Sequence, residues 1–191
     1  MAKRVLLLNP PHHTYALRDK YCSSSAKADY VWPPIDLLVL SGILSPFFEL
    51  KVVDAIAERL TADEALMDVA VFHPNVVIFL TGSATWKSDF NFIRLIKQKN
   101  KDLIAIGSGG NLLAHGEKII KNQGEIDAIL LNFTAPEIVD FINGNFSLPL
   151  GNIIARKDNL ISIGKFIENK NAFSYPKPRH EIFTLKKYQF P

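Results

Sequence analysis

The stretch DLIAIGSGGNLLAHGEKII, residues 102–120, contains an apolar run, a glycine-rich turn and a helical pattern in direct succession. The apolar run predicts a buried strand, and the periodicity after the turn predicts a helix over residues 111–121. Three glycines stand within four positions, at Gly107, Gly109 and Gly110. Because glycine tolerates positive φ and close approach by other atoms, the stretch predicts a strand-to-helix turn against which something packs closely.

Four further apolar runs resemble the one that precedes this turn. They lie at residues 4–10, 49–55, 75–81 and 125–131 and are rich in Val, Ile and Leu. Each is continuous rather than alternating, which is typical of strands covered on both faces in a parallel sheet. Helical patterns separate them, over residues 35–48, 61–73, 86–99 and 134–141. Thr61 with Glu64, and Thr134 with Glu137, have the spacing of capping boxes at two of the helix starts.

Five strands that alternate with five helices predict an α/β fold over residues 1–145. We expect a flavodoxin-like (Rossmann-like), doubly wound, five-stranded parallel sheet with strand order 2-1-3-4-5, because parallel crossovers are right-handed. Residues 146–191 are interpreted as a small C-terminal hairpin, built from NIIAR (152–156) and LISIG (160–164), and a tail that serves as a linker.

The tail from residue 169 onward contains five aromatic side chains without helical or strand periodicity. Such a cluster beside a core that five strands already complete predicts an interface with a domain outside this chain. The alternative is that the tail folds back onto the helices of its own domain. The aromatic residues are Phe173, Tyr175, Phe183, Tyr188 and Phe190.

Composition limits the possible functions. The 191 residues can bury one substantial core, and the net charge of +3 is spread along the chain, so nucleic-acid binding is not indicated. Cys22 is the sole cysteine, which excludes an internal disulfide and a metal site built from cysteines. It lies in CSSSAK, which is interpreted as a flexible loop with a bystander thiol. No apolar run approaches the length of a membrane span, so a cytoplasmic protein is expected.

In a doubly wound sheet, ligands bind beyond the carboxyl ends of the strands. The residues expected there are small and polar, which suits a bulky ligand lying across the edge, although tight turns alone would also favour such residues. The candidate cofactor-binding residues are Asn9, Pro10, Pro11, Asp54, Thr81, Gly82, Ser83, Gly107, Ser108, Gly109, Gly110, Asn111, Asn132 and Phe133.

Several common sites can be excluded from these residues. The dinucleotide fingerprint G-x-G-x-x-G fails at Leu112 and would follow the fourth strand rather than the first. A phosphoacceptor domain would need acids after the first and third strands, where Asn9 and Thr81 stand. A Walker loop is absent. His12 and His13 are interpreted as polar loop residues.

Five motifs in order resemble one family. VLLLNPP (5–11), WPPIDLLVLSGIL (32–44), VVDA (52–55), PNVVIFLT (74–81) and IGSGGN (106–111) are similar to the N-terminal cobalamin-binding domain of B12-dependent radical SAM proteins. The family type includes the anaerobic magnesium-protoporphyrin IX monomethyl ester cyclases. The resemblance runs from residue 4 to about residue 145, and residues 146–191 resemble the connector before the radical SAM barrel.

The resemblance implies cobalamin as the cofactor, with its nucleotide tail beside the glycine pair. Thr81 and Ser83 match the small hydroxyl positions of the family, and Gly109 and Gly110 match its glycine pair. We expect a valine at Gly109 to block corrinoid uptake while the domain stays folded. Of the family's later glycine-glutamate motif, only the acid at Glu137 is kept.

One departure from the wider B12-binding family concerns the motif D-x-H-x-x-G, whose histidine ligates cobalt from below. Here the segment reads Asp54-Ala-Ile-Ala-Glu-Arg59, so Ile56 replaces the histidine and Arg59 replaces the glycine. The loss is typical of the radical SAM branch. It implies that cobalamin binds base-off, with its benzimidazole displaced and without a histidine ligand.

The chain resembles only the cofactor-binding part of such an enzyme. A radical SAM centre needs three cysteines for its [4Fe–4S] cluster, so this chain alone is not expected to be catalytic. The cluster and S-adenosylmethionine would belong to a missing radical SAM domain of the same parent chain, a methyltransferase or cyclase of a small-molecule substrate. The alternatives are a flavodoxin-like domain that binds FMN or another nucleotide, and a degenerate docking domain without a cofactor.

Overall fold

The structure, a computed structural model, describes residues 2–20, 22–25, 31–144, 151–157, 160–168 and 175–189, with the backbone alone for residues 22–25. Five parallel strands form the centre of the main sheet, in the order β4-β1-β5-β6-β7. In chain order this is 2-1-3-4-5, as predicted. The strands are β1 (Arg4–Asn9), β4 (Glu49–Asp54), β5 (Val76–Leu80), β6 (Ile104–Ser108) and β7 (Ala128–Leu130).

The C-terminal hairpin is part of this sheet rather than an appendage. Its strands are β8 (Ile153–Lys157) and β9 (Leu160–Ile163), and β8 pairs antiparallel with β7. The predicted hairpin is therefore confirmed, but it extends the sheet from five strands to seven. The class remains α/β, with a mostly parallel, mixed sheet.

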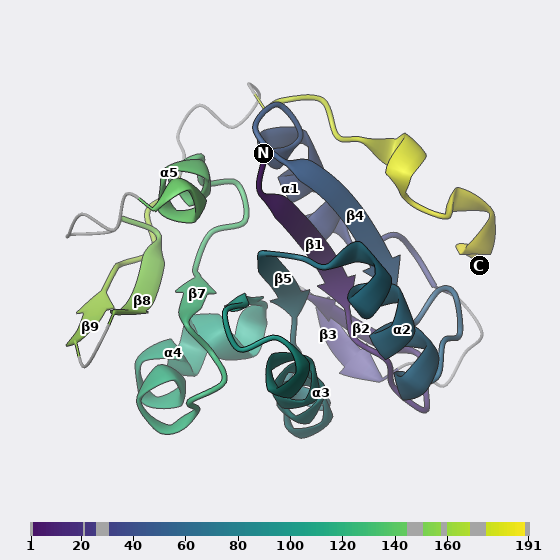
Figure 1. Ribbon diagram of the computed structural model, residues 1–191, viewed down its shortest axis with the longest axis horizontal. Helices are drawn as coiled ribbons and strands as arrows, with labels where there is room; N and C mark the ends of the chain where they lie inside the picture. The colour runs from purple at the N-terminus through teal and green to yellow at the C-terminus, as the bar shows by residue number, and fades with distance from the viewer. Residues whose placement is uncertain are drawn as a thin grey trace.

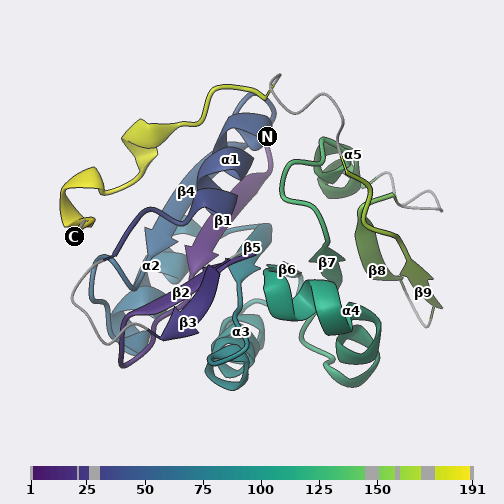
Figure 2. The same ribbon diagram turned by 180° about the vertical axis from the view of Figure 1, so that it is seen from behind.

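Helices cover both faces of the sheet, as Figures 1 and 2 show from opposite sides. On one face lie α1 (Ile35–Leu44) and α5 (Glu137–Asn143), and on the other lie α2 (Ala62–Phe72), α3 (Trp86–Lys99) and α4 (Gly110–Asn122). Alternate side chains of β1 enter the two cores: Val5 and Leu7 face α1, whereas Leu6 and Leu8 face α2 and α3. Burial on both faces is the reason that the strand is apolar throughout.

The helix starts were predicted with mixed success. The capping box at α2 is present, since Thr61 accepts from the Glu64 backbone N–H and Glu64 accepts from the Thr61 backbone N–H. The prediction of a second capping box is wrong. Pro136 is the residue before α5, and the Thr134 hydroxyl donates to the Asn132 side chain instead of capping the helix. Helix α1 ends at Leu44 rather than near residue 48. Ser45 keeps helical dihedrals, but Pro46 has no backbone N–H to continue the helical hydrogen bonds.

Residues expected to form a flexible loop instead make a second, two-stranded sheet. In it, β2 (Ala16–Asp19) pairs antiparallel with β3 (Cys22–Ser25). The assignment of residues 22–25 as a loop is therefore wrong. Serines at consecutive positions carry no hydrophobic alternation, so the strand gave no signal in the sequence.

The described part of the C-terminal tail packs on its own domain, as the alternative to an interface had it, and an interface with another domain stays a prediction. Phe183 and Tyr188 are 5% and 8% exposed and belong to the core on the α1 face. Val31 and Gln189 form a backbone bridge with N–H···O distances of 2.8 and 2.7 Å. The tail (yellow in Figure 1) runs along α1 and β4 and contains two 3₁₀ turns, His180–Ile182 and Leu185–Lys187. Phe173 and Phe190 lie outside the described residues.

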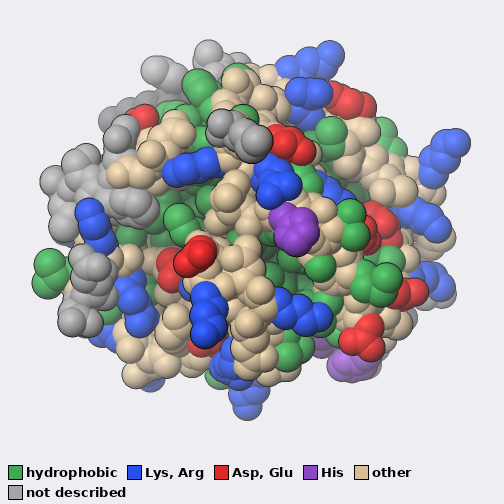
Figure 3. Space-filling model, in the orientation of Figure 1, with side chains coloured by type: hydrophobic (Ala, Val, Ile, Leu, Met, Phe, Trp, Pro, Cys, Tyr) green, Lys and Arg blue, Asp and Glu red, His purple; other side chains and the backbone are tan. Residues whose placement is uncertain are grey.

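On the surface seen in Figure 3, basic and acidic side chains are interspersed over the whole face. Among the helices that the structure describes, none is long and apolar enough to cross a bilayer.

Candidate functional site

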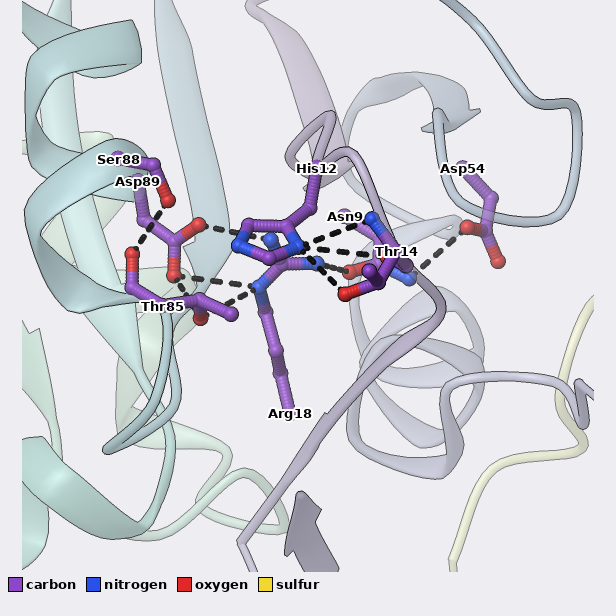
Figure 4. A network of polar contacts seen from close by, with 8 residues as sticks. All are labelled: Asn9, His12, Thr14, Arg18, Asp54, Thr85, Ser88 and Asp89. Atoms are coloured by element: carbon purple, nitrogen blue, oxygen red, sulfur yellow. Dashed lines mark hydrogen bonds and ion pairs between the residues drawn. The ribbon is translucent and has the colours of Figure 1, made fainter. Parts of the chain in front are cut away.

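The carboxyl ends of the parallel strands carry a buried polar network centred on Arg18. Its guanidinium forms an ion pair with Asp89 of α3 at 2.8 Å, and both side chains are fully buried. The same group donates to the Asn9 side chain at 2.8 Å and to the Thr85 hydroxyl at 3.1 Å (Figure 4). Arg18 thus ties β2 to the end of β1 and to the start of α3.

Asp54, at the end of β4, extends this network towards the C-terminal tail. One carboxylate oxygen accepts from the Asn9 amide at 2.8 Å and from the Ala57 backbone N–H at 3.1 Å, and the other accepts from the Tyr188 hydroxyl at 3.0 Å. Burial raises the pKa of Asp54, while these donors oppose the rise. Burial together with the Asp54 carboxylate raises the pKa of Tyr188, so its hydroxyl remains a donor.

Two further buried carboxylates fix the segment that follows β2. Asp36 accepts from the Lys20 backbone N–H at 3.0 Å, and Asp19 accepts from the Asp36 backbone N–H at 3.4 Å. Burial raises the pKa of Asp19 to about 6. Burial and the neighbouring Asp19 charge raise the pKa of Asp36 to about 7.

The glycine-rich turn is approached closely by the chain's own backbone. Gly109 has φ of 128°, and a Cβ there would lie 2.2 Å from the Thr81 carbonyl oxygen and 3.2 Å from that of Arg18. At Gly110 a Cβ would lie 2.9 Å from the carbonyl oxygen of Lys20. We call this region, over β5 and β6 and covered by Arg18–Lys20, the closed half of the edge. A valine at Gly109 would collide with this backbone, so we expect such a variant to lose stability as well as corrinoid uptake.

Thr81 is the one predicted site residue with a buried hydroxyl that lacks a hydrogen-bond partner among the described residues. Its neighbours Gly82 and Ser108 are buried, Ser83 is exposed, and Asn111 is half-buried at the start of α4. The Thr81 backbone N–H donates to the Ser108 carbonyl at 2.9 Å. A buried orphan hydroxyl is unusual, and at a strand end it marks a place where a ligand atom could bind.

Asn132 and Phe133, at the end of β7, lie away from this network. The Asn132 amide donates to the Ile167 carbonyl at 2.9 Å, and its oxygen accepts from Thr134. The Phe133 ring lies 6.0 Å from the Lys20 ammonium. The polar atoms of Asn132 therefore serve the local turn and the segment after β9.

The other half of the edge is hollowed. A cavity of about 820 Å³ lies beyond β1 and β4, between the loop after β1, the loop after β4 and α3, and we call this region the open half. Its described lining consists of Pro11, His12, His13, Thr14, Tyr15, Ala55, Ile56, Arg59, Leu60, Thr61, Ala62, Ser88, Asn91, Phe92 and Leu95.

The predicted and observed sites overlap only in part. The structure brings Asn9 and Asp54 together in one network and packs Thr81 against Gly109, but Pro11 is the one predicted residue that lines the cavity. His12, which had been set aside as a loop residue, lines it too. Burial lowers the pKa of His12, and the charges of His13 and Arg18 lower it further. A backbone hydrogen bond to Thr14 and the charge of Asp89 raise it.

No protein-family model matches this chain, and no curated protein matches it in sequence. Its structure is similar to that of OxsB, described as a cobalamin-dependent S-adenosylmethionine radical enzyme in an apo, selenomethionine-labelled form, with a TM-score of 0.67 and 13% sequence identity. The similarity covers 98% of this chain and 25% of the OxsB chain. The chain therefore shares its fold with about a quarter of that protein.

Proposed function

We propose that this chain is a cobalamin-binding module of a B12-dependent radical SAM enzyme. The observation that carries the proposal is the cavity of about 820 Å³ at the carboxyl edge, in a fold similar to part of a cobalamin-dependent enzyme. Cavities of this size at strand ends are where doubly wound folds bind their ligands. The corrin would lie over the open half, with one face left towards a second domain.

The cavity lining is compatible with a corrinoid that has no protein ligand on cobalt. Ile56 lies in the lining at the position where the wider family has its cobalt-binding histidine, and its side chain has no donor atom. Phe92 and Leu95 add apolar surface for the ring, and Asn91 can bond its peripheral amides. This supports base-off binding without a histidine ligand.

The rest of the activity is assigned to other parts of the parent protein. Bound cobalamin would supply methyl transfer or electron exchange. S-adenosylmethionine and a [4Fe–4S] cluster would be held by a radical SAM domain, for which the single cysteine of this chain is insufficient. The parent enzyme would be a methyltransferase or an oxidative cyclase acting on a small-molecule substrate.

The test is a titration of the purified chain with hydroxocobalamin and, separately, with FMN, followed by absorption spectroscopy after gel filtration. We expect corrinoid to co-elute with a base-off spectrum and FMN to be lost. Asn91→Trp, an exposed residue of the cavity lining on α3, should weaken uptake at least tenfold by filling the cavity. Gln98→Trp, exposed on the same helix but outside the cavity, is the matched control.

Electron paramagnetic resonance of the Co(II) form then checks the ligand. No splitting from a protein imidazole is expected, because Ile56 offers no nitrogen. Retention of FMN instead of corrinoid would favour the nucleotide-binding alternative, and retention of neither would favour a docking domain. Splitting traced to His12 or His13 by isotope labelling would leave cobalamin binding intact and refute the ligand-free geometry.

A further inference from the structure

Arg59 stands in a backbone conformation that favours glycine. Its φ is 56°, and among the described residues only His73 shares a positive φ without being glycine. The position is five residues after Asp54, where the D-x-H-x-x-G motif has its final glycine, a residue that tolerates such a φ. Arginine at this position strains the backbone. Strained residues of this kind cluster at binding sites and persist where surrounding contacts hold them, here the backbone bonds of the turn around Arg59.

The Arg59 side chain is available for a ligand. It is exposed, lines the cavity, and lies with its guanidinium 5.2 Å from the centre of the Tyr15 ring. It forms no hydrogen bond or ion pair with any residue that the structure describes. The adjacent acid, Glu58, accepts a hydrogen bond from the Thr184 hydroxyl at 3.0 Å. The cation–π contact with Tyr15 leaves the N–H donors of the guanidinium free.

The surroundings of Arg59 favour an anion. The described lining of the cavity contains an arginine and two histidines but no Asp or Glu. The rings of His12 and His13 lie 4.2 Å apart, and His12 Nδ1 lies 3.1 Å from the Thr14 hydroxyl. Burial lowers the pKa of His12, so this imidazole is a weaker base than a free one, and Arg59 is the constant positive charge of the described lining. The nearest helix start, at α2, is already capped by Thr61 and Glu64, so the side chains supply the charge.

We propose that Arg59 binds a phosphate group in this cavity, with His12 and His13 beside it. The planar fork of an arginine matches two phosphate oxygens. The assignment deepens the proposed function and rests on it for the larger ligand: the phosphate would be the phosphodiester in the nucleotide loop of cobalamin. The same chemistry would also hold a free phosphate monoester such as that of FMN.

The first arm of the test compares cobalamin with cobinamide, which lacks the nucleotide loop and its phosphate. Wild-type protein should bind hydroxocobalamin about tenfold more tightly than cobinamide, because cobinamide cannot form the hydrogen-bonded charge pair between Arg59 and the phosphate. Arg59→Ala should remove that difference and leave cobinamide affinity unchanged. Arg59→Gly should show the same loss of hydroxocobalamin affinity as Arg59→Ala. It should unfold at a higher temperature than wild type and Arg59→Ala, because glycine relieves the backbone strain.

The outcomes separate the two proposals. If both corrinoids bind equally to wild type and Arg59→Ala, the phosphate site is refuted while the cobalamin module stands. If neither corrinoid binds, the proposed function fails, and a second arm tests the site alone. In that arm, inorganic phosphate should raise the melting temperature of wild type but not of Arg59→Ala, and FMN should bind more tightly than riboflavin if the source is a monoester. Equal responses of the two proteins would refute the site.

Discussion

The two halves of the carboxyl edge are both formed by the ends of parallel strands, but the chain itself covers one half, whereas the other borders a cavity. Over β5 and β6, the closed half is covered by Arg18–Lys20, and the glycine pair meets backbone carbonyl oxygens of the chain itself. Over β1 and β4, the open half keeps a cavity with an unpaired arginine and two histidines in its described lining. Glycines at strand ends therefore signal close packing without identifying the partner, whereas an uncompensated charge beside a cavity is the observation on which the proposed ligand site rests.

The largest effect is expected at the ion pair that holds the closed half shut. Arg18→Met leaves the fully buried Asp89 carboxylate without its countercharge, which should lower the free energy of unfolding by about 3–5 kcal/mol. Lys51→Met, at the partly exposed pair with Asp68, is the control and should cost less than about 1 kcal/mol. Urea denaturation followed by circular dichroism measures both.

The double variant Arg18→Met with Asp89→Leu sharpens the interpretation. It removes both charges, so much of the lost stability should return. If Arg18→Met alone behaves like Lys51→Met, the network does not close this half of the edge in solution.

A smaller effect is expected at the glycine turn. Gly109→Ala places a Cβ against the Thr81 carbonyl at a positive φ, and should cost roughly 2–3 kcal/mol of stability. Gly124→Ala is the matched control, because nothing lies within 4 Å of the added Cβ, and it should change stability by no more than about 0.5 kcal/mol. Equal melting temperatures of the two variants would show that the segment Arg18–Lys20 does not cover the turn.

The regular part of the fold could be predicted from the sequence because its signal is local. The continuous apolar strands and the amphipathic helices each show their burial within a few residues, as in α3, whose bounds Trp86–Lys99 match the predicted range. The serine-rich strand β3 has no such pattern. The buried tail residues Phe183 and Tyr188 pack through contacts with segments far away in the chain, such as the Tyr188 bond to Asp54.

The candidate site could be predicted only in location. The strand-end rule places Asn9, Asp54 and Thr81 at the edge where the buried network lies, but the pairing of Arg18 with Asp89 joins residues 71 positions apart. No spacing rule reports such a pair. The role proposed for Arg59 had a sequence signal, since arginine stands where the family motif has glycine, but the meaning of that signal depends on its φ of 56°.

The smallest effect on stability is expected from Asp19 and Asp36, the buried carboxylates that anchor the segment Arg18–Lys20 over the closed half. The pKa of Asp36 is raised to about 7 by burial and by Asp19, whose own pKa is raised to about 6 by burial. A raised pKa means that the folded state holds protons which the unfolded chain releases. The stabilisation is therefore complete below the unfolded pKa of about 4 and is lost as the pH rises through about 7.

Wild-type protein should accordingly lose stability as the pH rises from roughly 4 to 7, and Asp36→Asn should flatten that decline by about 1 kcal/mol. Asparagine keeps an oxygen that accepts from the Lys20 backbone N–H, so the anchor itself is preserved. Glu64 provides the contrast: hydrogen bonds from Thr61 lower its pKa, so its contribution is lost only as the pH falls through that lower value. Glu64→Gln should therefore leave the slope above pH 5 unchanged. Urea midpoints measured across this pH range decide the matter, since equal slopes in wild type and Asp36→Asn would mean that Asp36 is not buried and the segment over the closed half is not anchored there.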